Sequence, residues 1–535
     1  MVENEVKDMR KCLTAKEMQN LEVDTIKNVG IPSIVLMEKA ALAVVNIIEE
    51  KWNGRNKKER TIWCVCGRGN NGADGLAVGR LLYQKGYQVA IVTIGDANKS
   101  TEEYKIQESI DSKLGIPFYD GIYSQTQSCD VNQEWTSQVK PKDWIVDGIF
   151  GIGLKRTIGA PYSDLIQQMN ECGCEKVIAI DIPTGIDAST GAILGCAVKA
   201  DMTVTFGYEK CGHYLQSGRE YRGELFVADI GFAKSSESVL DSDLGILDAT
   251  DMVEIPERLE TSHKGTYGKL LIVAGSDGMC GAAYLCAKAA YRMGAGLVKI
   301  LTVESNRAIL QTQLPEAIIE TYQTQDSVNH DTSYSISDEI SATVAVACQW
   351  ATTIIMGPGL GQADYVKPLV ATVLKYVKEH AIPCVLDSDA LNTISKYGEL
   401  EQYYTKQMVL TPHVLEMSRL TKLSIAELKS NPVESVEAYV MEHGVSCIFK
   451  DAISVIANAE GEKFLNVNGS SALAKAGSGD VLAGIVGGLI CIGMKSSRAA
   501  IFAPYIHGRA GSRAADKLGK HGVLAGDLLL ELSHK

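Results

Sequence analysis

The sequence lacks an excess of positive charge and lacks any long apolar run, and each absence excludes a class of protein. Lysine and arginine number 52 against 65 aspartates and glutamates, so the net charge is −13. Proteins that bind polyanions usually carry basic patches, so we expect no nucleic-acid partner. The short basic stretch Lys57–Arg60 is better explained as a solvated loop. The longest apolar run, Gly484–Met494, is far shorter than the roughly 20 residues of a membrane span.

Cysteine is too sparse for a disulfide-stapled secreted domain, with 14 in 535 residues. Cys64 and Cys66 lie inside a strand-like run, which favours buried, reduced thiols. The spacing Cys172-Gly173-Cys174 lacks a second pair, so no zinc site is expected. No charged-then-apolar signal peptide opens the chain. We therefore expect a soluble, cytoplasmic protein that does not bind a membrane.

The length and the alternation of elements predict two α/β domains. A chain of 535 residues exceeds the roughly 250–300 residues at which single cores stop growing. Short β-branched runs alternate with helical stretches, a pattern typical of parallel α/β folds. The segment Ala233–Asp251 is rich in Ser and Asp and interrupts this rhythm. We therefore predict one domain over residues 1–240 and a second over residues 245–535.

Individual elements can be placed within each half. The predicted strands are Thr61–Cys66, Gln88–Ile94, Asp143–Asp147, Lys176–Asp181, Met202–Phe206, Lys269–Ala274, Gly296–Leu301, Thr353–Met356, Cys384–Leu386, Met408–Thr411 and Cys447–Phe449. The predicted helices include Ala73–Gln84, Ser163–Asn170, Ala282–Met293 and Asp480–Ile492. The polar stretch Gln323–Ser337 is predicted to be a surface loop.

Three polar loops follow predicted strands in the first half. The stretch from Cys66 to Gly75 is glycine-rich and opens a helix, so its backbone can approach a ligand and offer free amides to an anion. Asp147–Gly153 and Ile180–Gly185 close two further strands with a carboxylate and a glycine turn. Ligands of parallel sheets bind beyond the carboxyl ends of the strands, so we expect the three loops to converge on one crevice. The alternative is that each acid only caps its own turn.

These loops closely resemble the NAD(P)H-hydrate epimerase domain. The matching motifs are GRGNNGADG, DGIFGIGL and DIPTGID, together with Gly30-Ile31-Pro32-Ser33 and Leu36-Met37-Glu38. The resemblance covers roughly residues 10–235. Two small departures are Ala73, where glycine is usual, and Thr184, where serine is usual.

The resemblance implies a Rossmann-like, three-layer fold that acts on the hydrated nicotinamide ring. It makes Asp181 the catalytic acid/base, a role that requires a tuned pKa or geometry. It implies a potassium ion bound by Asn71, Asp147 and Thr184. Asp181 would also contact the substrate, together with Asn70, Asn71, Gly72, Ala73, Asp74, Gly151, Ile152, Gly153, Leu154, Lys155, Arg156 and Thr157.

A second glycine-rich loop, Ala476–Gly484, lies near the C-terminus. Gly-Ser-Gly precedes Asp480 at the start of an apolar helix, so backbone amides and the helix dipole face the same place as a carboxylate. A simple aspartate N-cap is the alternative, but it needs no glycine run before it. The loop is not a Walker motif because no Gly-Lys-Ser/Thr follows. We therefore interpret it as an anion hole.

The second half resembles the ribokinase-like, ADP- or ATP-dependent NAD(P)H-hydrate dehydratases over roughly residues 245–535. The motifs that carry this resemblance are Gly477–Asp480, Met356–Gly361, Leu386–Asn392, Leu410–His413, His263–Gly265, Gly268–Lys269 and Gly275–Ser276. One departure is Asp451 in Lys450-Asp451-Ala452, where the family often has glycine. The predicted fold is an α/β/α sandwich.

This resemblance makes Asp480 the catalytic base and Gly477–Gly479 the group that stabilises the transferring phosphoryl charge. The hydrated dinucleotide would contact Ala282, Gly359, His413 and Asp480. The nucleotide would contact Lys450, Asp451, Ala452, Ile453, Ser454, Gly477, Ser478 and Gly479. Magnesium is expected with the nucleotide. The fusion of both domains favours ADP over ATP as the phosphoryl donor.

The two halves together predict a bifunctional enzyme that repairs hydrated NADH and NADPH, and we expect it to form a homo-oligomer. Two other functions stay open. A kinase for a vitamin-precursor alcohol would use the same Gly-Ser-Gly-Asp loop and the same fold, although Gly357–Gly361 and Leu386–Asn392 argue against it. The first domain could instead be a non-catalytic binding module, although the intact set of Asn71, Asp147 and Asp181 argues against that.

Overall fold

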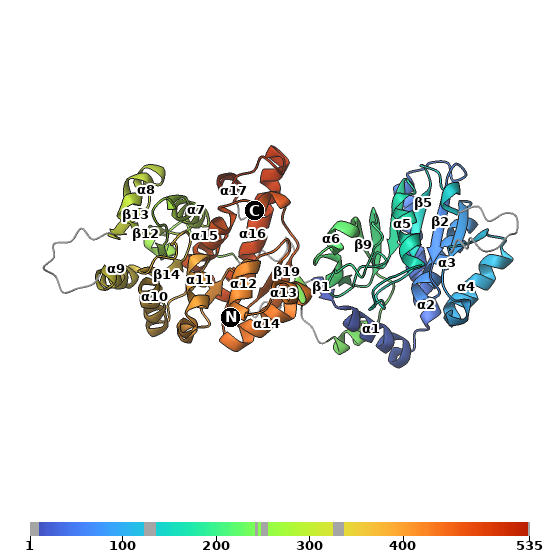
Figure 1. Cartoon of the computed structure of the whole chain (residues 1–535), viewed down its shortest axis with the longest axis horizontal. Coiled ribbons are helices and arrows are strands. Elements are labelled where there is room, and N and C mark those ends of the chain that lie inside the picture. Colours follow the sequence, from blue (N-terminus) through green and yellow to red (C-terminus); the bar gives the residue numbers. More distant parts are fainter. Residues whose placement is uncertain (1–9, 122–134, 241–243, 248–254, 325–335, 533–535) are drawn as a thin grey trace. The chain divides into compact units, whose positions relative to one another are not determined.

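The computed structural model describes residues 10–121, 135–240, 244–247, 255–324 and 336–532. Its internal contacts divide the chain into two compact units, one made of Lys11–Asp243 and the other chiefly of Leu244–Lys535 (Figure 1). Both units combine helices with largely parallel sheets, so the predicted α/β class is confirmed.

The N-terminal unit contains one parallel sheet with the strand order β4-β3-β2-β5-β6-β7-β9. Its strands are β2 (Thr61–Cys66), β3 (Gln88–Thr93), β4 (Phe118–Asp120), β5 (Trp144–Gly148), β6 (Lys176–Ile180), β7 (Met202–Phe206) and β9 (Glu224–Ala228). A separate parallel pair joins β1 (Arg10–Leu13) to β8 (Glu209–Lys210). The main helices are α1 (Ala15–Asp24), α2 (Ser33–Trp52), α3 (Asn70–Gln84), α4 (Glu102–Lys113) and α5 (Tyr162–Glu171).

Alternating side chains bury both faces of this sheet. In β2, Ile62 and Cys64 join the apolar cluster of α2 and α3, whereas Trp63 and Val65 join the cluster of α5 on the other face. Successive strand residues point to opposite faces, so a strand covered on both sides must be apolar throughout. The result is the predicted three-layer arrangement, with its ligand-binding edge at the carboxyl ends of the strands.

The C-terminal unit has the strand order β13-β12-β11-β14-β15-β16-β17-β18-β19-β10. The strands are β10 (Leu244–Ile246), β11 (Lys269–Val273), β12 (Leu297–Val303), β13 (Ile318–Tyr322), β14 (Thr353–Met356), β15 (Cys384–Leu386), β16 (Met408–Leu410), β17 (Ser446–Phe449), β18 (Ser454–Ala457) and β19 (Lys463–Asn466). In this order, each strand from β13 through β12, β11, β14, β15 and β16 to β17 pairs in parallel with the next. Strand β18 pairs antiparallel with both β17 and β19.

One face of this sheet packs on a large apolar cluster from α7 (Cys280–Arg292), α15 (Ser478–Cys491), α16 (Ser496–Leu518) and α17 (Ala525–Glu531). Helix α15 is buried almost all round, as its uninterrupted apolar sequence requires. The helices α9 (Ile336–Trp350), α10 (Val366–His380) and α14 (Pro432–His443) contribute nothing to this cluster, and α9 and α14 contact strands of the sheet.

Most predicted strands agree with the structure to within two residues, but some features differ. Helix α3 begins at Asn70, three residues before the predicted start at Ala73, because extended Gly69 is its N-cap. The interruption at Ala233–Asp251 contains the short strand β10, whose buried Leu244 and Ile246 give too brief a signal to recognise. Much of the predicted loop Gln323–Ser337 lies outside the described residues, and Ile336 and Ser337 belong to α9.

The described residues bear on the predictions about disulfides, zinc sites and membrane spans. The cysteines in this part of the chain are all free thiols. The same residues contain no cluster of three or more His, Cys, Asp or Glu side chains that could hold a metal ion. No helix within the described ranges is long and apolar enough to cross a membrane.

Candidate active sites

The first candidate site lies where the strand order of the N-terminal sheet reverses, between β2 and β5. Parallel sheets bind ligands at such a switch point, beyond the carboxyl ends of the strands. The loop after β2 carries Asn70 and Asn71, and β5 carries Asp147. An added Cβ at Gly151 would come within 3.0 Å of Asn71 Oδ1, so the loops after β2 and β5 meet here as predicted.

Asp147 and Thr184 form a buried polar pair at this edge. The Thr184 backbone amide donates to Asp147 Oδ2 at 2.8 Å, and its hydroxyl donates to Oδ1 at 2.7 Å. Burial raises the pKa of Asp147 to about 6 despite these hydrogen bonds, because no lysine or arginine forms an ion pair with it among the described residues. The side-chain nitrogen assigned to nearby Asn71 is buried and has no hydrogen-bond partner among the residues that the structure describes.

These groups are chemically suited to a weakly hydrated cation. A buried carboxylate that lacks a cationic partner is costly, and a bound monovalent cation would relieve that cost. The oxygen and nitrogen of an asparagine amide are nearly indistinguishable, so Asn71 can present its oxygen where its nitrogen has no partner. Asn71, Asp147 and Thr184 therefore fit the potassium ion that the resemblance implies.

Asp181 follows β6 and is held by a buried lysine. Lys210 Nζ lies 2.6 Å from Asp181 Oδ1, and the lysine side chain is fully buried. The Thr205 hydroxyl donates to the same oxygen at 2.8 Å. Burial alone would raise the pKa of Asp181, but the Lys210 ammonium and these hydrogen bonds hold it below its usual value. The side chain is therefore a carboxylate at neutral pH.

The backbone around Asp181 is strained, and it is fixed from behind by a neutral histidine. Asp181 has a φ of +64°, which is uncommon for a residue with a side chain and is often found at functional sites. His213 Nε2 lies 2.9 Å from the Asp181 carbonyl oxygen. Burial and then the Lys210 charge lower the pKa of His213 to about 3, so the ring is neutral. Asp181 is thereby positioned before any substrate binds.

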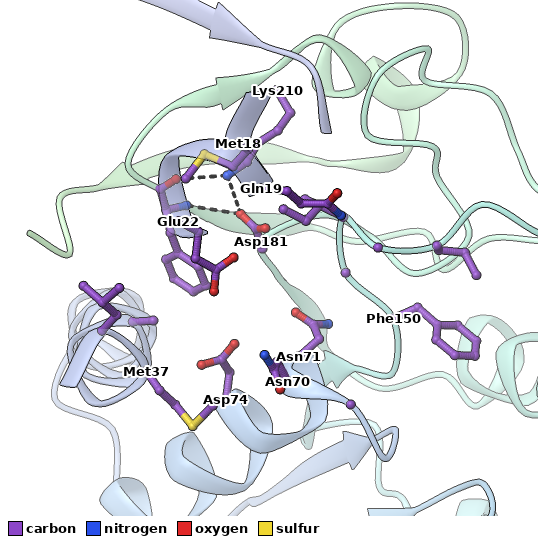
Figure 2. Close-up of a pocket in the computed structure, with 18 of the residues that line it drawn as sticks. Met18, Gln19, Glu22, Met37, Asn70, Asn71, Asp74, Phe150, Asp181 and Lys210 are labelled. Carbon is purple, nitrogen blue, oxygen red and sulfur yellow. Dashed lines mark hydrogen bonds and ion pairs between the residues drawn. The ribbon is translucent and has the colours of Figure 1, made fainter. Parts of the chain in front are cut away.

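Asp181 faces a cavity of about 640 Å³ (Figure 2). Most of the predicted substrate contacts line this cavity, namely Asn70, Asn71, Asp74, Gly151, Ile152, Gly153, Leu154, Lys155, Arg156 and Asp181. Three do not. Ala73 is fully buried in the core, and Thr157 is exposed outside the cavity. Gly72 packs on Gly67, and a Cβ added at Gly72 would lie 1.8 Å from the Gly67 carbonyl oxygen.

Other lining residues could not be found from the sequence motifs. Lys210 comes from β8, a strand of only two residues. Met18, Gln19 and Glu22 come from α1, which precedes every glycine-rich loop. A sequence signal for α1 does exist, since Thr14 and Glu17 form a capping box at its start, but it says nothing about a cavity.

The second candidate site lies at the equivalent switch point of the C-terminal sheet, between β11 and β14. The loop after β14 contains Gly359, and an added Cβ there would lie 3.0 Å from the Cβ of Ala282 on α7. Ser276 in the loop after β11 donates its hydroxyl to the Gly359 carbonyl at 2.9 Å. Two predicted substrate contacts, Ala282 and Gly359, are therefore adjacent.

A buried ion pair joins the loops after β15 and β17. Lys450 Nζ lies 2.8 Å from Asp387 Oδ1, and the Asp387 side chain is fully buried. The Thr411 hydroxyl donates to the same oxygen at 2.5 Å. Burial would lower the pKa of Lys450, but Asp387 and Glu416 raise it, so the lysine is charged. No role was predicted for Asp387, the partner of Lys450, although it lies in the Leu386–Asn392 motif.

His413 begins α12 (Val414–Thr421) beside this ion pair. Its Nδ1 accepts from the Leu415 amide at 3.1 Å, and its backbone forms a bridge with Lys450. Burial, and then the Lys450 charge, lower the pKa of His413. The neutral ring is half-exposed, and its Nε2 lies 3.2 Å from Oε1 of the buried Glu416 carboxyl group.

Asp480 lies in the first turn of α15. Among the described residues, no lysine or arginine forms an ion pair with it. Burial and the charge of Asp387 raise its pKa to about 7, whereas Lys450 lowers it less. An added Cβ at Gly479 would come within 3.2 Å of Lys450 Nζ, so the Gly477–Gly479 turn and the lysine form a narrow cradle. Free amides at a helix N-terminus together with a lysine suit a phosphate. The predicted anion hole, Lys450 and Asp480 lie together.

The other predicted nucleotide contacts lie on the turn from β17 to β18. Asp451 is exposed and pairs with Lys429 at 3.5 Å. Ile453 is buried, and Ser454 begins β18. Ser478 points away from the cradle, and its hydroxyl lies 3.1 Å from Nε2 of buried His507. Asp389, Glu416 and His507 complete the polar surroundings, and the sequence motifs assigned them no role.

Each unit therefore has a carboxyl group with a shifted pKa near the switch point of a parallel sheet, and this arrangement suits a two-site α/β enzyme. Family models match both units: "NAD(P)H-hydrate dehydratase" over residues 270–534 and "YjeF-related protein N-terminus" over residues 33–212.

Relatives match almost the whole length. The bifunctional NAD(P)H-hydrate repair enzyme of Moorella thermoacetica is 34% identical over 526 residues, which cover 97% of this chain and 95% of the relative. The enzyme of the same name from Escherichia coli is 31% identical over 472 residues, covering 88% and 84%. This chain belongs to the family of bifunctional NAD(P)H-hydrate repair enzymes, and the predicted family and enzyme class are confirmed.

Solved structures also match the C-terminal half. The ADP/ATP-dependent NAD(P)H-hydrate dehydratase from Bacillus subtilis, co-crystallised with ATP and Mg²⁺, is 29% identical and covers 54% of this chain and 96% of its own, with a TM-score of 0.44. A ribokinase-like superfamily protein from Enterococcus faecalis is 24% identical, with coverages of 54% and 94% and a TM-score of 0.46.

Proposed function

We propose that the N-terminal unit interconverts the R and S hydrates of NADH and NADPH, and that the C-terminal unit dehydrates the S hydrate with ADP as the preferred phosphoryl donor. The observation that carries this proposal is the pair of carboxylates, Asp181 and Asp480, at the switch points of two separate sheets. Their opposite electrostatic settings suit two different reactions.

In the N-terminal unit, Asp181 acts as the acid/base at the hydrated carbon, and Lys210 keeps it ionised between turnovers. Asn71, Asp147 and Thr184 would hold potassium, which would supply a fixed positive charge in the site. The loop that contains Gly151–Arg156 contacts the nucleotide part of the substrate.

In the C-terminal unit, Asp480 accepts the proton of the substrate hydroxyl while that oxygen receives the phosphoryl group. The amides of Gly477–Gly479 and the Lys450 ammonium are oriented before the reaction toward the charge that develops on the phosphoryl oxygens. Magnesium accompanies the nucleotide phosphates, as is usual for such sites. The bond from the substrate carbon to the phosphate then breaks with its electron pair on the phosphate, and the neighbouring ring carbon loses a proton to solvent, which restores the double bond of the dihydronicotinamide ring.

The test is an incubation of the full chain with a mixture of both hydrate epimers and either ADP or ATP, followed by the return of the reduced-dinucleotide absorbance. We expect complete recovery, faster with ADP than with ATP, and no recovery of S hydrate without nucleotide. A stable phosphorylated product from a vitamin-precursor alcohol would instead favour the kinase alternative. Binding of both epimers without turnover would favour the binding-module alternative. The homo-oligomeric state and the cytoplasmic location stay predictions.

A further inference from the structure

Helix α1 adds a second carboxyl group to the epimerase cavity. Glu22 lies on the last turn of α1 and lines the cavity together with Asp181 and with Asp74 of α3 (Figure 2). Its side chain is half-buried. Glu22 precedes the residues 33–212 that match the family model, and none of the glycine-rich loops contains it. Met18 and Gln19 of the same helix also line the cavity, so α1 forms one wall.

The pKa of Glu22 is shifted in the opposite direction from the pKa of Asp181. Burial raises the pKa of Glu22, and the Asp181 charge raises it further; Lys210 lowers it and Glu103 of α4 raises it. Burial, followed by the charges of Asp181 and Glu22, also raises the pKa of Asp74. Lys210 is already bound to Asp181 at 2.6 Å. One cavity thus contains one carboxyl group with a lowered pKa and another with a raised pKa, and enzymes use such a divergence to separate a base from an acid.

Epimerisation of a hydrated dihydronicotinamide requires both an acid and a base. Water adds to the ring's enamine so that the hydroxyl is on the carbon bonded to the ring nitrogen. Inverting that carbon by loss and return of water requires an acid, because hydroxide leaves poorly without a proton, and a base, because the entering water must lose one. An acid and a base on different walls of the cavity can serve the two faces of the ring.

We propose that Glu22 of helix α1 is the second catalytic group of the epimerase site. This inference rests on the proposed epimerase function. Glu22 gives its proton to the departing hydroxyl, the carbon–oxygen bond breaks with its electron pair on the oxygen, and the ring nitrogen's lone pair forms a planar iminium. A water on the other face then bonds to that carbon and gives its proton to Asp181. The reverse conversion uses the same two groups in exchanged roles.

The test compares full-length wild type with Glu22→Gln, Glu22→Asp and the control Glu50→Gln, which alters an exposed glutamate of α2 outside the cavity. Pure R hydrate is supplied without nucleotide, and the two epimers are separated and quantified over time. We expect Glu22→Gln to lower kcat for epimerisation by about 10²–10⁴-fold with little change in KM. Glu22→Asp should retain part of the activity, and Glu50→Gln all of it.

Two readouts separate catalysis from folding. Dehydration of pure S hydrate by each variant reports on the other unit and should stay at the wild-type rate. Epimerisation by wild type in ¹⁸O-labelled water should place one solvent oxygen in the product hydroxyl for each inversion. Retention of the original oxygen would overturn the proposal whatever the variants do.

The outcomes also distinguish this inference from the proposed function. A wild-type chain that does not epimerise the hydrate refutes the proposed function itself. A wild type that epimerises, with Glu22→Gln equal to it in rate and in pH profile, refutes only the role of Glu22.

Discussion

The two aspartates proposed as acid–base groups, Asp181 and Asp480, lie in opposite electrostatic settings. Asp181 forms a direct ion pair with Lys210, which is fully buried and has no other carboxylate within ion-pair distance among the described residues. In the other unit the comparable lysine, Lys450, forms its ion pair with Asp387 at 2.8 Å. Asp480 forms no ion pair within the part of the chain that the structure describes. The pKa of Asp181 is consequently held below its usual value, whereas that of Asp480 is raised to about 7.

This difference shows that the position in the sheet places a carboxylate but does not set its chemistry. The carboxyl end of a parallel strand or the start of the following helix brings the side chain to the ligand. The partner of the nearest lysine then decides whether the group is a permanent anion or one that titrates near neutral pH. The second setting suits a base that must accept a proton during a single step.

The largest effect on stability is expected from Lys210→Met. The substitution leaves Asp181 as a buried charge without its partner, which costs about 3–5 kcal/mol in free energy of unfolding. Lys176→Met is the matched control, because the Lys176–Asp201 pair is exposed and such pairs contribute about 0–1 kcal/mol. Trp52, Trp63, Trp135 and Trp144 all lie in the N-terminal unit, so denaturant unfolding followed by tryptophan fluorescence reports mainly on it. Equal losses of unfolding free energy from both substitutions would contradict the larger stabilisation expected from the buried pair.

The two activities should depend on pH in opposite ways. Dehydration needs ionised Asp480, so its kcat/KM should fall about tenfold per pH unit below a midpoint near 7. Epimerisation has its base already ionised because the pKa of Asp181 is lowered, and it needs the proton of Glu22, whose pKa is raised, so it should decline as pH rises. Separate assays on pure epimers across pH 5–9 measure both profiles. Parallel profiles would contradict the electrostatic contrast.

A smaller effect is expected from the cation. Replacing potassium with tetramethylammonium should slow epimerisation, because Asn71, Asp147 and Thr184 suit a small, weakly hydrated ion. Dehydration of pure S hydrate serves as the control and should not change. Thr184→Val removes the hydroxyl and should make the epimerisation rate insensitive to the choice of cation. Equal epimerisation rates of the wild type in both salts would contradict the assignment.

Local patterns were sufficient to predict the parallel strands and the loops that follow them. Buried strands such as Thr61–Cys66 and Met202–Phe206 are continuous apolar or β-branched runs, and their ends are therefore marked by the first glycine or charged residue. The positions of Asn71, Asp147 and Asp181 follow from that pattern and from the geometry of a parallel sheet.

The partners of these residues could not be predicted in the same way. Lys210 and Glu22 lie 29 residues after and 159 residues before Asp181, on elements that no motif connects with the loop. The ion pair between Lys450 and Asp387 joins residues that are 63 positions apart in the sequence, and it depends on the order of strands in the sheet. A sequence motif can therefore identify a catalytic carboxylate, but its protonation state depends on long-range packing.

The most direct test of the central claim, one carboxylate for each reaction, is a crossed assay of Asp181→Asn and Asp480→Asn in the full chain. Asp480→Asn should lose dehydration of S hydrate by about 10²–10⁴-fold and keep epimerisation. Asp181→Asn should still repair pure S hydrate, and with both epimers it should show one fast phase of partial amplitude followed by a phase at the spontaneous epimerisation rate. Loss of both activities in either folded variant would contradict the assignment of two independent sites.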